Sequence, residues 1–398
     1  MDIPVSIPRF DNIKDYHHYW SVAAPVLPTS PRFLHIALDI CNTCNLRCRI
    51  CYLSVPKPHE KAIFLSAERF QECLKDLLPF TQALRLSCGY EPLASPHFNA
   101  ILQSLAPYRV PHLELVTNAT LLSDDKIDAI IRNNVNTVRI SLDSPDKTIF
   151  EFIRRGANFE AVIANIKRLA SRKKARGTQR PELALIAVLM QSTIHQLKPL
   201  VDLAANLGID ALTLQHLIPY PGLDMESQVI TEKDAPRFDV LIGQIQAYAQ
   251  QHGIALTAPS PFKPQPPAPA GQLKQPLSRS RGFCQALFHP IISASQNIRK
   301  ITAGLISRGL RPVRRNLLPR HPFCPDPFNS IIITANGRVK ACPHLKGTPQ
   351  HKIFDLNMPL TSVFLGDEYQ TLRQIMMAGG PHRPECLACH HRRLFNIK

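Results

Sequence analysis

The sequence lacks any run of about eighteen consecutive apolar residues, so we expect no transmembrane helix. Its first ten residues, MDIPVSIPRF, contain an acid and lack the basic and apolar segments of a secretory signal peptide. Eleven cysteines without such a signal favour a reducing compartment, which we expect to be the cytoplasm. In that setting clustered cysteines bind metals or carry out redox chemistry more often than they form disulfides.

Acidic residues are missing between Asp239 and Asp326, although eleven Lys and Arg residues fall in the same interval. Much of the formal net charge of +17 therefore lies in one segment. Such a segment suits contact with phosphates or an anionic surface, and a solvated linker is the simpler alternative. Its basic residues are interleaved with few aromatics beyond Phe283 and Phe288. Base stacking is therefore poorly supported, and nucleic acid is an unlikely partner.

Short apolar runs alternate with helical patterns over residues 33–220. The apolar runs are FLHIALDI, ALRLSCG, HLELVTN, NTVRISLD, LALIAVLM and ALTLQHLI, and the helical patterns cover 66–78, 96–107, 123–134, 158–174 and 194–207. Runs rich in Leu, Ile and Val are typical of strands buried in a parallel sheet. Ser66 and Ser123 are the expected N-caps of two of the helices. Six strands alternating with helices predict an α/β fold, either a parallel barrel or part of one.

Changes in composition divide the chain into four predicted segments. These are an N-terminal extension (1–32), the α/β core (33–257), a Pro-rich basic insertion or linker (258–322) and a small cysteine-rich domain (323–398). Within the insertion, Ile291, Ile298, Ile301 and Leu305 have near-helical spacing and basic residues lie between them. This pattern predicts a modestly amphipathic basic helix, which could make a weak contact with an anionic membrane surface or pack on the core.

Four of the eleven cysteines fall within DICNTCNLRCRICYLS, residues 39–54. Cys44, Cys48 and Cys51 have the spacing C-x3-C-x2-C, which can hold three corners of a [4Fe–4S] cluster. A cluster normally has four cysteine ligands, so this one would keep an iron open for a substrate or cofactor. Zinc is the alternative, because C-x2-C pairs such as Cys41 and Cys44 commonly bind it. The loop follows the first predicted strand, at the end where barrel active sites lie.

CNLRCRIC after a first strand resembles the signature of the radical S-adenosylmethionine (SAM) superfamily. The resemblance implies that SAM chelates the open iron and that one electron cleaves it to a 5'-deoxyadenosyl radical, which takes hydrogen from a substrate. It also implies that Ile50 lies against the adenine. SCGYEP at 87–92 resembles the family's GGEP motif, which holds the SAM amino group. The motif keeps Gly89, Glu91 and Pro92, whereas Tyr90 departs from the usual glycine.

Two further strand ends match the family in order. LVTNAT at 115–120 and RISLDS at 139–144 bring Asn118, Ser141 and Asp143 to the same face, and Arg154 resembles a basic position after the fourth strand. The resemblance, which covers about half the chain, implies that these residues contact SAM. Asn118 and Ser141 have a second interpretation, because either could cap the helix after its strand.

The other cysteines in the core have simpler interpretations. Cys41 is expected to be a packed or spare thiol, Cys73 a core residue, and Cys88 a buried residue rather than a hydrogen donor. Cys284, in the basic insertion, has no assignment.

A second cysteine set lies near the C-terminus. Cys324 and Cys342 flank a predicted hairpin whose turn is Asn336-Gly337, and Cys386 and Cys389 follow as C-x2-C. Four thiolates can fill all the corners of a second [4Fe–4S] cluster or bind a structural zinc. The arrangement resembles the SPASM/Twitch extension of radical SAM enzymes, in its shorter form with one auxiliary cluster.

Together these patterns predict a radical SAM enzyme with a partial (β/α)6 barrel and a SPASM/Twitch-like domain. Modification of a peptide or a protein is the favoured reaction, and dehydrogenation or rearrangement of a sugar-like small molecule is the alternative. A reductant such as flavodoxin or ferredoxin is an expected partner. The rival from another class is a zinc-stabilised basic protein that binds nucleic acid.

Overall fold

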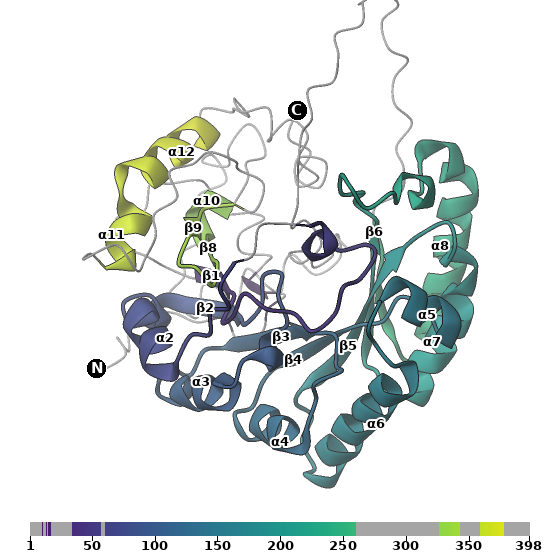
Figure 1. Ribbon diagram of the computed structural model, residues 1–398, viewed down its shortest axis with the longest axis horizontal. Helices are drawn as coiled ribbons and strands as arrows, with labels where there is room; N and C mark the ends of the chain where they lie inside the picture. The colour runs from purple at the N-terminus through teal and green to yellow at the C-terminus, as the bar shows by residue number, and fades with distance from the viewer. Residues whose placement is uncertain are drawn as a thin grey trace, which may run out of the picture.

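The computed structural model describes residues 10, 13, 15–16, 34–56, 60–259, 326–342 and 359–377. Within these ranges the strands form one sheet in the order β7-β6-β5-β4-β3-β2-β1-β8-β9. The strands are β1 (Leu34–Leu38), β2 (Thr81–Arg85), β3 (His112–Thr117), β4 (Thr137–Ser141), β5 (Glu182–Leu189), β6 (Ala211–His216), β7 (Ala255–Thr257), β8 (Ser330–Ile333) and β9 (Val339–Lys340). Strands β1 to β7 are all parallel. The sheet is curved, with helices on its outer side, which confirms the predicted α/β fold class (Figure 1).

All five helical patterns of the core are confirmed, and additional helices are present. The helices are α2 (Ala67–Leu74), α3 (Phe98–Ser104), α4 (Asp124–Arg132), α5 (Lys147–Ile153), α6 (Phe159–Ala175), α7 (Leu197–Asn206), α8 (Ala235–Gln251), α10 (Asp326–Asn329), α11 (Leu360–Leu365) and α12 (Asp367–Met377). The Ser66 hydroxyl caps α2 by accepting a 3.2 Å bond from the Arg69 N–H. Ser123 occupies the N-cap of α4, but its hydroxyl donates to the Asp125 carboxylate instead of accepting from the backbone.

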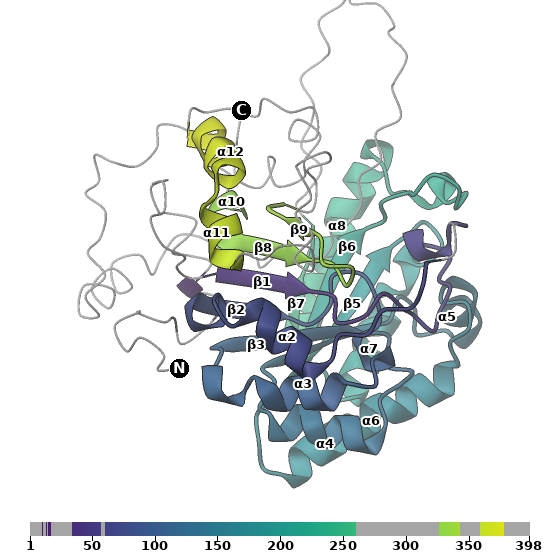
Figure 2. The ribbon, with the colours of Figure 1, turned by 60° about the vertical axis from the view of Figure 1, so that its left-hand side comes forward.

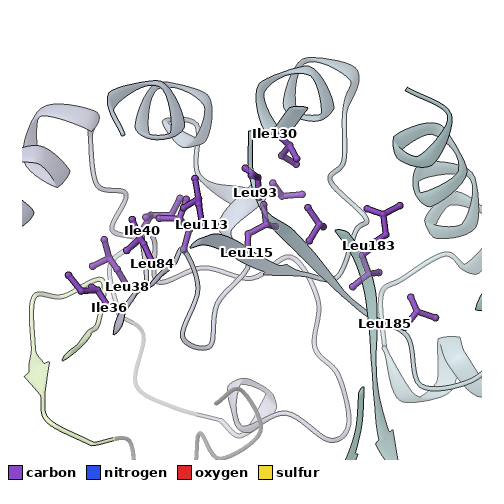
Figure 3. Close-up of a cluster of buried hydrophobic side chains, with 14 of the residues drawn as sticks. Ile36, Leu38, Ile40, Leu84, Leu93, Leu113, Leu115, Ile130, Leu183 and Leu185 are labelled. Carbon is purple, nitrogen blue, oxygen red and sulfur yellow. The ribbon is translucent and has the colours of Figure 1, made fainter. Parts of the chain in front are cut away.

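The main hydrophobic core fills the space between the sheet and the helices. Leu84, Leu113 and Leu115 point from the strands toward the helices, where Ile130 of α4 meets them (Figure 3). Because side chains alternate along a strand, the residues between them face the inner side of the sheet. The strands therefore supply the core with one set of side chains and the inner face with the other.

Charged side chains lie on this inner face of β2, β3 and β4. Arg85 pairs with Glu114, and Arg139 Nε donates a 3.1 Å bond to the other carboxylate oxygen. Burial alone would raise the pKa of Glu114, but the two guanidinium groups hold it well below its usual value. The network was not predicted, because its members stand singly among apolar residues in the sequence.

The C-terminal hairpin joins the main sheet. Its first strand, β8, runs parallel to β1 with Ile36 opposite Ile331, and β9 returns antiparallel to β8 (Figure 2). The predicted turn is confirmed, since Gly337 has φ +77°, a conformation that glycine adopts without steric cost. The segment after β1 is therefore flanked on one side by residues nearly 300 positions later in the chain.

The predicted basic helix and Cys284 lie outside the described residues. Among helices within the described ranges, none combines the length and apolar character that crossing a bilayer requires.

Candidate active site

Cys44, Cys48 and Cys51 lie on the loop that follows β1. This loop crosses the inner side of the curved sheet (dark purple in Figure 1). We call residues 41–51 the cysteine loop. Cys48 is buried, while Cys44 and Cys51 are partly buried, and none of the three forms a disulfide. The loop is held by backbone bonds to the chain after α5, from Arg47 N to Arg155 O at 3.0 Å and from Arg49 N to Ile153 O at 2.8 Å.

Two N–H donors lie near the Cys44 thiol of the cysteine loop. The Leu46 N–H lies 3.5 Å from Cys44 Sγ, and the Asn118 side-chain amide lies 3.9 Å from the same sulfur. Burial raises the pKa of the Cys44 thiol to about 12, and negative charge on nearby groups, including Cys48 and Cys51, adds to the effect. Without a cation the Cys44 thiol therefore stays protonated, whereas a bound metal would deprotonate it.

The donor set fits an iron–sulfur cluster. Within the described ranges, no three His, Cys, Asp or Glu side chains converge as they must around a single metal ion. A cubane makes a different demand, because each of its cysteines binds a separate iron. Thiols on one loop, with N–H donors and a guanidinium close by, meet that demand.

The guanidinium belongs to Arg154, which follows α5. Its Nε and Nη2 donate to the two carboxylate oxygens of Asp143, at 2.7 and 3.1 Å. Asp143 also accepts a 2.9 Å bond from the Val188 N–H, and Arg154 forms a hydrogen bond with Cys48. Burial disfavours the charged guanidinium, but Asp143 and Cys48 outweigh it and raise the pKa of Arg154. The end of β4 is thereby tied to the cysteine loop.

The turn at 87–90, where β2 ends, is organised by Asp39. The Asp39 Oδ1 atom accepts bonds from the N–H groups of Cys88 at 2.6 Å, Gly89 at 3.0 Å and Tyr90 at 3.5 Å. Gly89 packs closely against Tyr52, because a Cβ atom at this position would lie 2.3 Å from the Tyr52 hydroxyl unless the tyrosine side chain shifted. Sequence reasoning did not identify Asp39, although an acid directly after a buried strand, at the active-site end, was a usable signal.

Glu91 lies next to the turn, with its carboxylate fully engaged by the chain. It accepts from the Thr117 hydroxyl at 2.7 Å and from the N–H groups of Asn118 at 2.8 Å and Leu93 at 3.1 Å. Burial raises the pKa of Glu91, and these three donors oppose the rise. The Glu91 N–H donates to Thr43 O at 3.1 Å, so the turn and the cysteine loop are joined directly.

The remaining predicted SAM contacts lie at the same end of the sheet. Asn118 donates to Asn45 Oδ1 at 3.0 Å, and Ile50 packs on an apolar cluster that contains Ile153. Ser141 is partly buried at the end of β4, and Pro92 begins a short 3-10 helix. The helix-capping interpretation of Asn118 and Ser141 is wrong, because Ser123 and Asp146 occupy the N-caps of α4 and α5. Contact of these residues with SAM stays a prediction.

The other cysteines divide between packing and the undescribed part of the chain. Cys41, Cys73 and Cys88 are buried as expected, and the Cys41 thiol donates to Glu91 O at 3.2 Å. Cys342 is also buried. Cys324, Cys386 and Cys389 lie outside the described residues, so the predicted auxiliary site is described only at Cys342.

Comparison with known proteins identifies the core. The family described as the Radical SAM superfamily matches residues 38–223. A tungsten-containing aldehyde ferredoxin oxidoreductase cofactor-modifying protein from Pyrococcus furiosus is 27% identical over 188 residues, covering 46% of this chain and 52% of its own. A GTP 3',8-cyclase from Synechocystis sp. is 28% identical over 143 residues, covering 36% and 43%. The matches thus span about half, or less, of these relatives' length.

Solved structures extend the similarity of fold to most of the chain. Streptococcus suis SuiB bound to S-adenosylmethionine has a TM-score of 0.61 at 14% identity, covering 92% of this chain and 72% of its own. The protein anSMEcpe with bound AdoMet has a TM-score of 0.54 at 13% identity, covering 91% and 88%. At these identities the likeness establishes the fold alone.

Proposed function

Since residues 38–223 of this chain form a radical SAM domain, we propose that the protein is a radical SAM enzyme that modifies a peptide or another protein. The observation that carries the proposal is the cysteine loop, with three closely spaced cysteines outside any disulfide, at the carboxyl end of a parallel sheet. In this proposal Cys44, Cys48 and Cys51 hold a [4Fe–4S] cluster with one open iron. Bound there, the cluster and SAM supply hydrogen abstraction from the substrate.

The chain's own residues orient SAM and fix the thiols. The turn at 87–90 supplies backbone groups for the SAM amino group, and Ile50 supplies an apolar surface for the adenine. Arg154 offsets negative charge at the thiolate of Cys48, which it contacts.

A peptide or protein substrate is supported by the relatives' reported partners. SuiB, with a TM-score of 0.60 in this form, is described bound to its precursor peptide SuiA. anSMEcpe is described with AdoMet and a bound peptide at a TM-score of 0.54. The Pyrococcus furiosus relative is described as cofactor-modifying, which agrees with maturation of another protein as one form of this activity.

A small-molecule substrate is the second candidate, and the charges on the inner face of the sheet favour it. Arg85 and Arg139 both pair with the carboxylate of Glu114, so positively charged groups lie side by side there. The Arg139 side chain is 25% exposed, so its charge can reach an anionic substrate. Because some relatives are named GTP 3',8-cyclase, we propose a nucleotide or another sugar-containing anion as the small-molecule substrate to test.

The C-terminal cysteines would hold an auxiliary [4Fe–4S] cluster in this proposal. Cys342 lies two residues after the end of β9 and is buried, and Cys324, Cys386 and Cys389 would complete the ligand set. Flavodoxin or ferredoxin would supply electrons. We also propose, from the sequence alone, that the basic insertion binds weakly to an anionic membrane.

The substrate class is tested by adding size-fractionated cell extract to the anaerobically reconstituted enzyme with SAM and a reductant. We expect the macromolecular fraction to increase 5'-deoxyadenosine formation, and protease treatment of that fraction to remove the increase. The Cys48→Ala variant is the control for formation that does not depend on the cluster. Stimulation by only the small-molecule fraction, unchanged by protease, would overturn the peptide proposal in favour of the second candidate.

A further inference from the structure

Asp39 is a buried carboxylate with an unusual set of partners. Asp39 lies directly after β1 and is 3% exposed. One of its carboxylate oxygens accepts hydrogen bonds from three successive backbone N–H groups. Successive N–H groups that converge on one acceptor form a concave anion site. Here the anion is part of the chain itself, so its role is to hold the backbone of the turn.

The direction of these N–H groups also fixes the carbonyl groups of the turn. In a trans peptide the C=O of one residue points opposite to the N–H of the next. With the N–H groups of Cys88, Gly89 and Tyr90 turned toward Asp39, the carbonyls of Ser87, Cys88 and Gly89 point away from it. Carbonyl oxygens are the backbone groups that can accept from an ammonium, so Asp39 controls the acceptors available to an amino group.

The C-terminal hairpin completes the surroundings of Asp39. The Asp39 N–H donates to Ile333 O of β8 at 2.9 Å, and Cys88 packs against Ile332 of the same strand. Lys340 of β9 acts on the carboxylate and lowers its pKa. Among the described residues, Cys41 and Tyr90 are titratable groups that also interact with Asp39.

Ionising this carboxyl is unfavourable for the fold. Burial raises the pKa of Asp39 to about 6, although three N–H groups and Lys340 oppose the rise. A neutral side chain at this position would avoid the cost of burying a charge. A carboxylate at this position therefore suits a task other than stability.

We propose that Asp39 is a positioning residue for SAM, which orients the turn at 87–90 through its backbone N–H groups, and that the β8–β9 hairpin supports it. The inference rests on the proposed function, because it assigns a cause to the geometry of the SAM-binding turn. It also gives the C-terminal hairpin a role in SAM binding that needs no auxiliary cluster.

The test is the dissociation constant for SAM, measured by equilibrium dialysis on the reconstituted protein together with its iron content. We expect Asp39→Ala to weaken binding at least about tenfold at pH 8, since several bonds to a charged acceptor are lost, with the iron content unchanged. Asp39→Asn keeps an acceptor oxygen and should bind within a few-fold of the wild type. Equal binding by wild type and Asp39→Ala would overturn the proposal.

The pH dependence separates positioning from a purely structural role. Wild-type affinity should fall a few-fold as the pH drops through about 6, where Asp39 takes up a proton and becomes a neutral acceptor like Asn, and Asp39→Asn should not show this step. Lys340→Ala should move the step to higher pH, because a charge that favours the carboxylate is lost. Arg338→Ala, at an exposed position in the hairpin turn, is the matched control and should leave it in place.

The same step in Asp39→Asn as in the wild type would also contradict the inference. Failure of the proposed function looks different, because wild-type protein with its full iron content would then bind no SAM at any pH.

Discussion

The guanidinium of Arg154 and the carboxylate of Asp143 form a buried two-bond ion pair, 2.7 and 3.1 Å long, in contact with Cys48. The pair links the end of β4 to the cysteine loop, and its planar geometry fixes both partners. Removing one member leaves the other as an uncompensated buried charge.

Arg154→Ala should therefore lower the free energy of unfolding by about 3–5 kcal/mol. Urea denaturation of the protein without its cluster measures this directly. Arg155→Ala is the matched control, because its side chain is exposed, and it should change the free energy by less than about 0.5 kcal/mol. Equal effects of the two variants would mean that the ion pair does not hold the loop.

Gly89 and Tyr52 give a prediction about steric fit. In Gly89→Ala the new Cβ would lie 2.3 Å from the Tyr52 hydroxyl and 3.3 Å from the next ring atom. We expect Gly89→Ala to lose SAM binding and Gly89→Ala/Tyr52→Phe to recover much of it, because only the hydroxyl contact is prohibitive. Equilibrium dialysis with SAM measures both variants, and Tyr52→Phe alone is the control. If the double variant did not recover SAM binding, the loss would come from a change in the backbone and not from the contact with the Tyr52 hydroxyl.

The raised pKa of Asp39 predicts how the free energy of unfolding changes with pH. Its pKa is about 6 in the folded protein and 3.8 when unperturbed, so the folded state binds the proton more tightly. Its stabilising contribution is present below pH 3.8 and is lost as the pH rises through about 6. Relative to the wild type, Asp39→Asn should gain about 3 kcal/mol of unfolding free energy between about pH 4 and pH 7. Denaturant titrations across this range measure the difference, and a constant difference would contradict the raised pKa.

Replacing Cys386 and Cys389 with Ala should separate the two cysteine sets. Reconstituted wild type should contain about eight irons, and the double variant about four. SAM cleavage without substrate turnover should persist in the variant, while turnover falls much further. Equal loss of both activities in a folded, soluble preparation would make the C-terminal site structural.

The sequence was sufficient for features whose signal is local. The six strands are continuous apolar runs, and the spacing of Cys44, Cys48 and Cys51 places them on one loop, where their binding of a cluster stays a prediction. Ser66 was recognised as a cap because its partner, Arg69, is three residues away.

Contacts between distant parts of the chain were not predictable in this way. Asp39 meets the turn at 87–90 only because β1 and β2 are neighbours. The pairing of β8 with β1 joins segments nearly 300 residues apart, and short apolar strands carry little information about their partner. Arg85 and Glu114 were overlooked because each stands alone between apolar residues.

The measurement that tests the account most directly is 5'-deoxyadenosine formation from SAM by anaerobically reconstituted protein with a strong reductant. Cys41 and Cys48 are both buried thiols in the cysteine loop, but only Cys48 is assigned to the cluster. We predict product from the wild type and from Cys41→Ala, and none above background from Cys48→Ala. No product from iron-replete wild type, or product from Cys48→Ala but not from Cys41→Ala, would contradict the account.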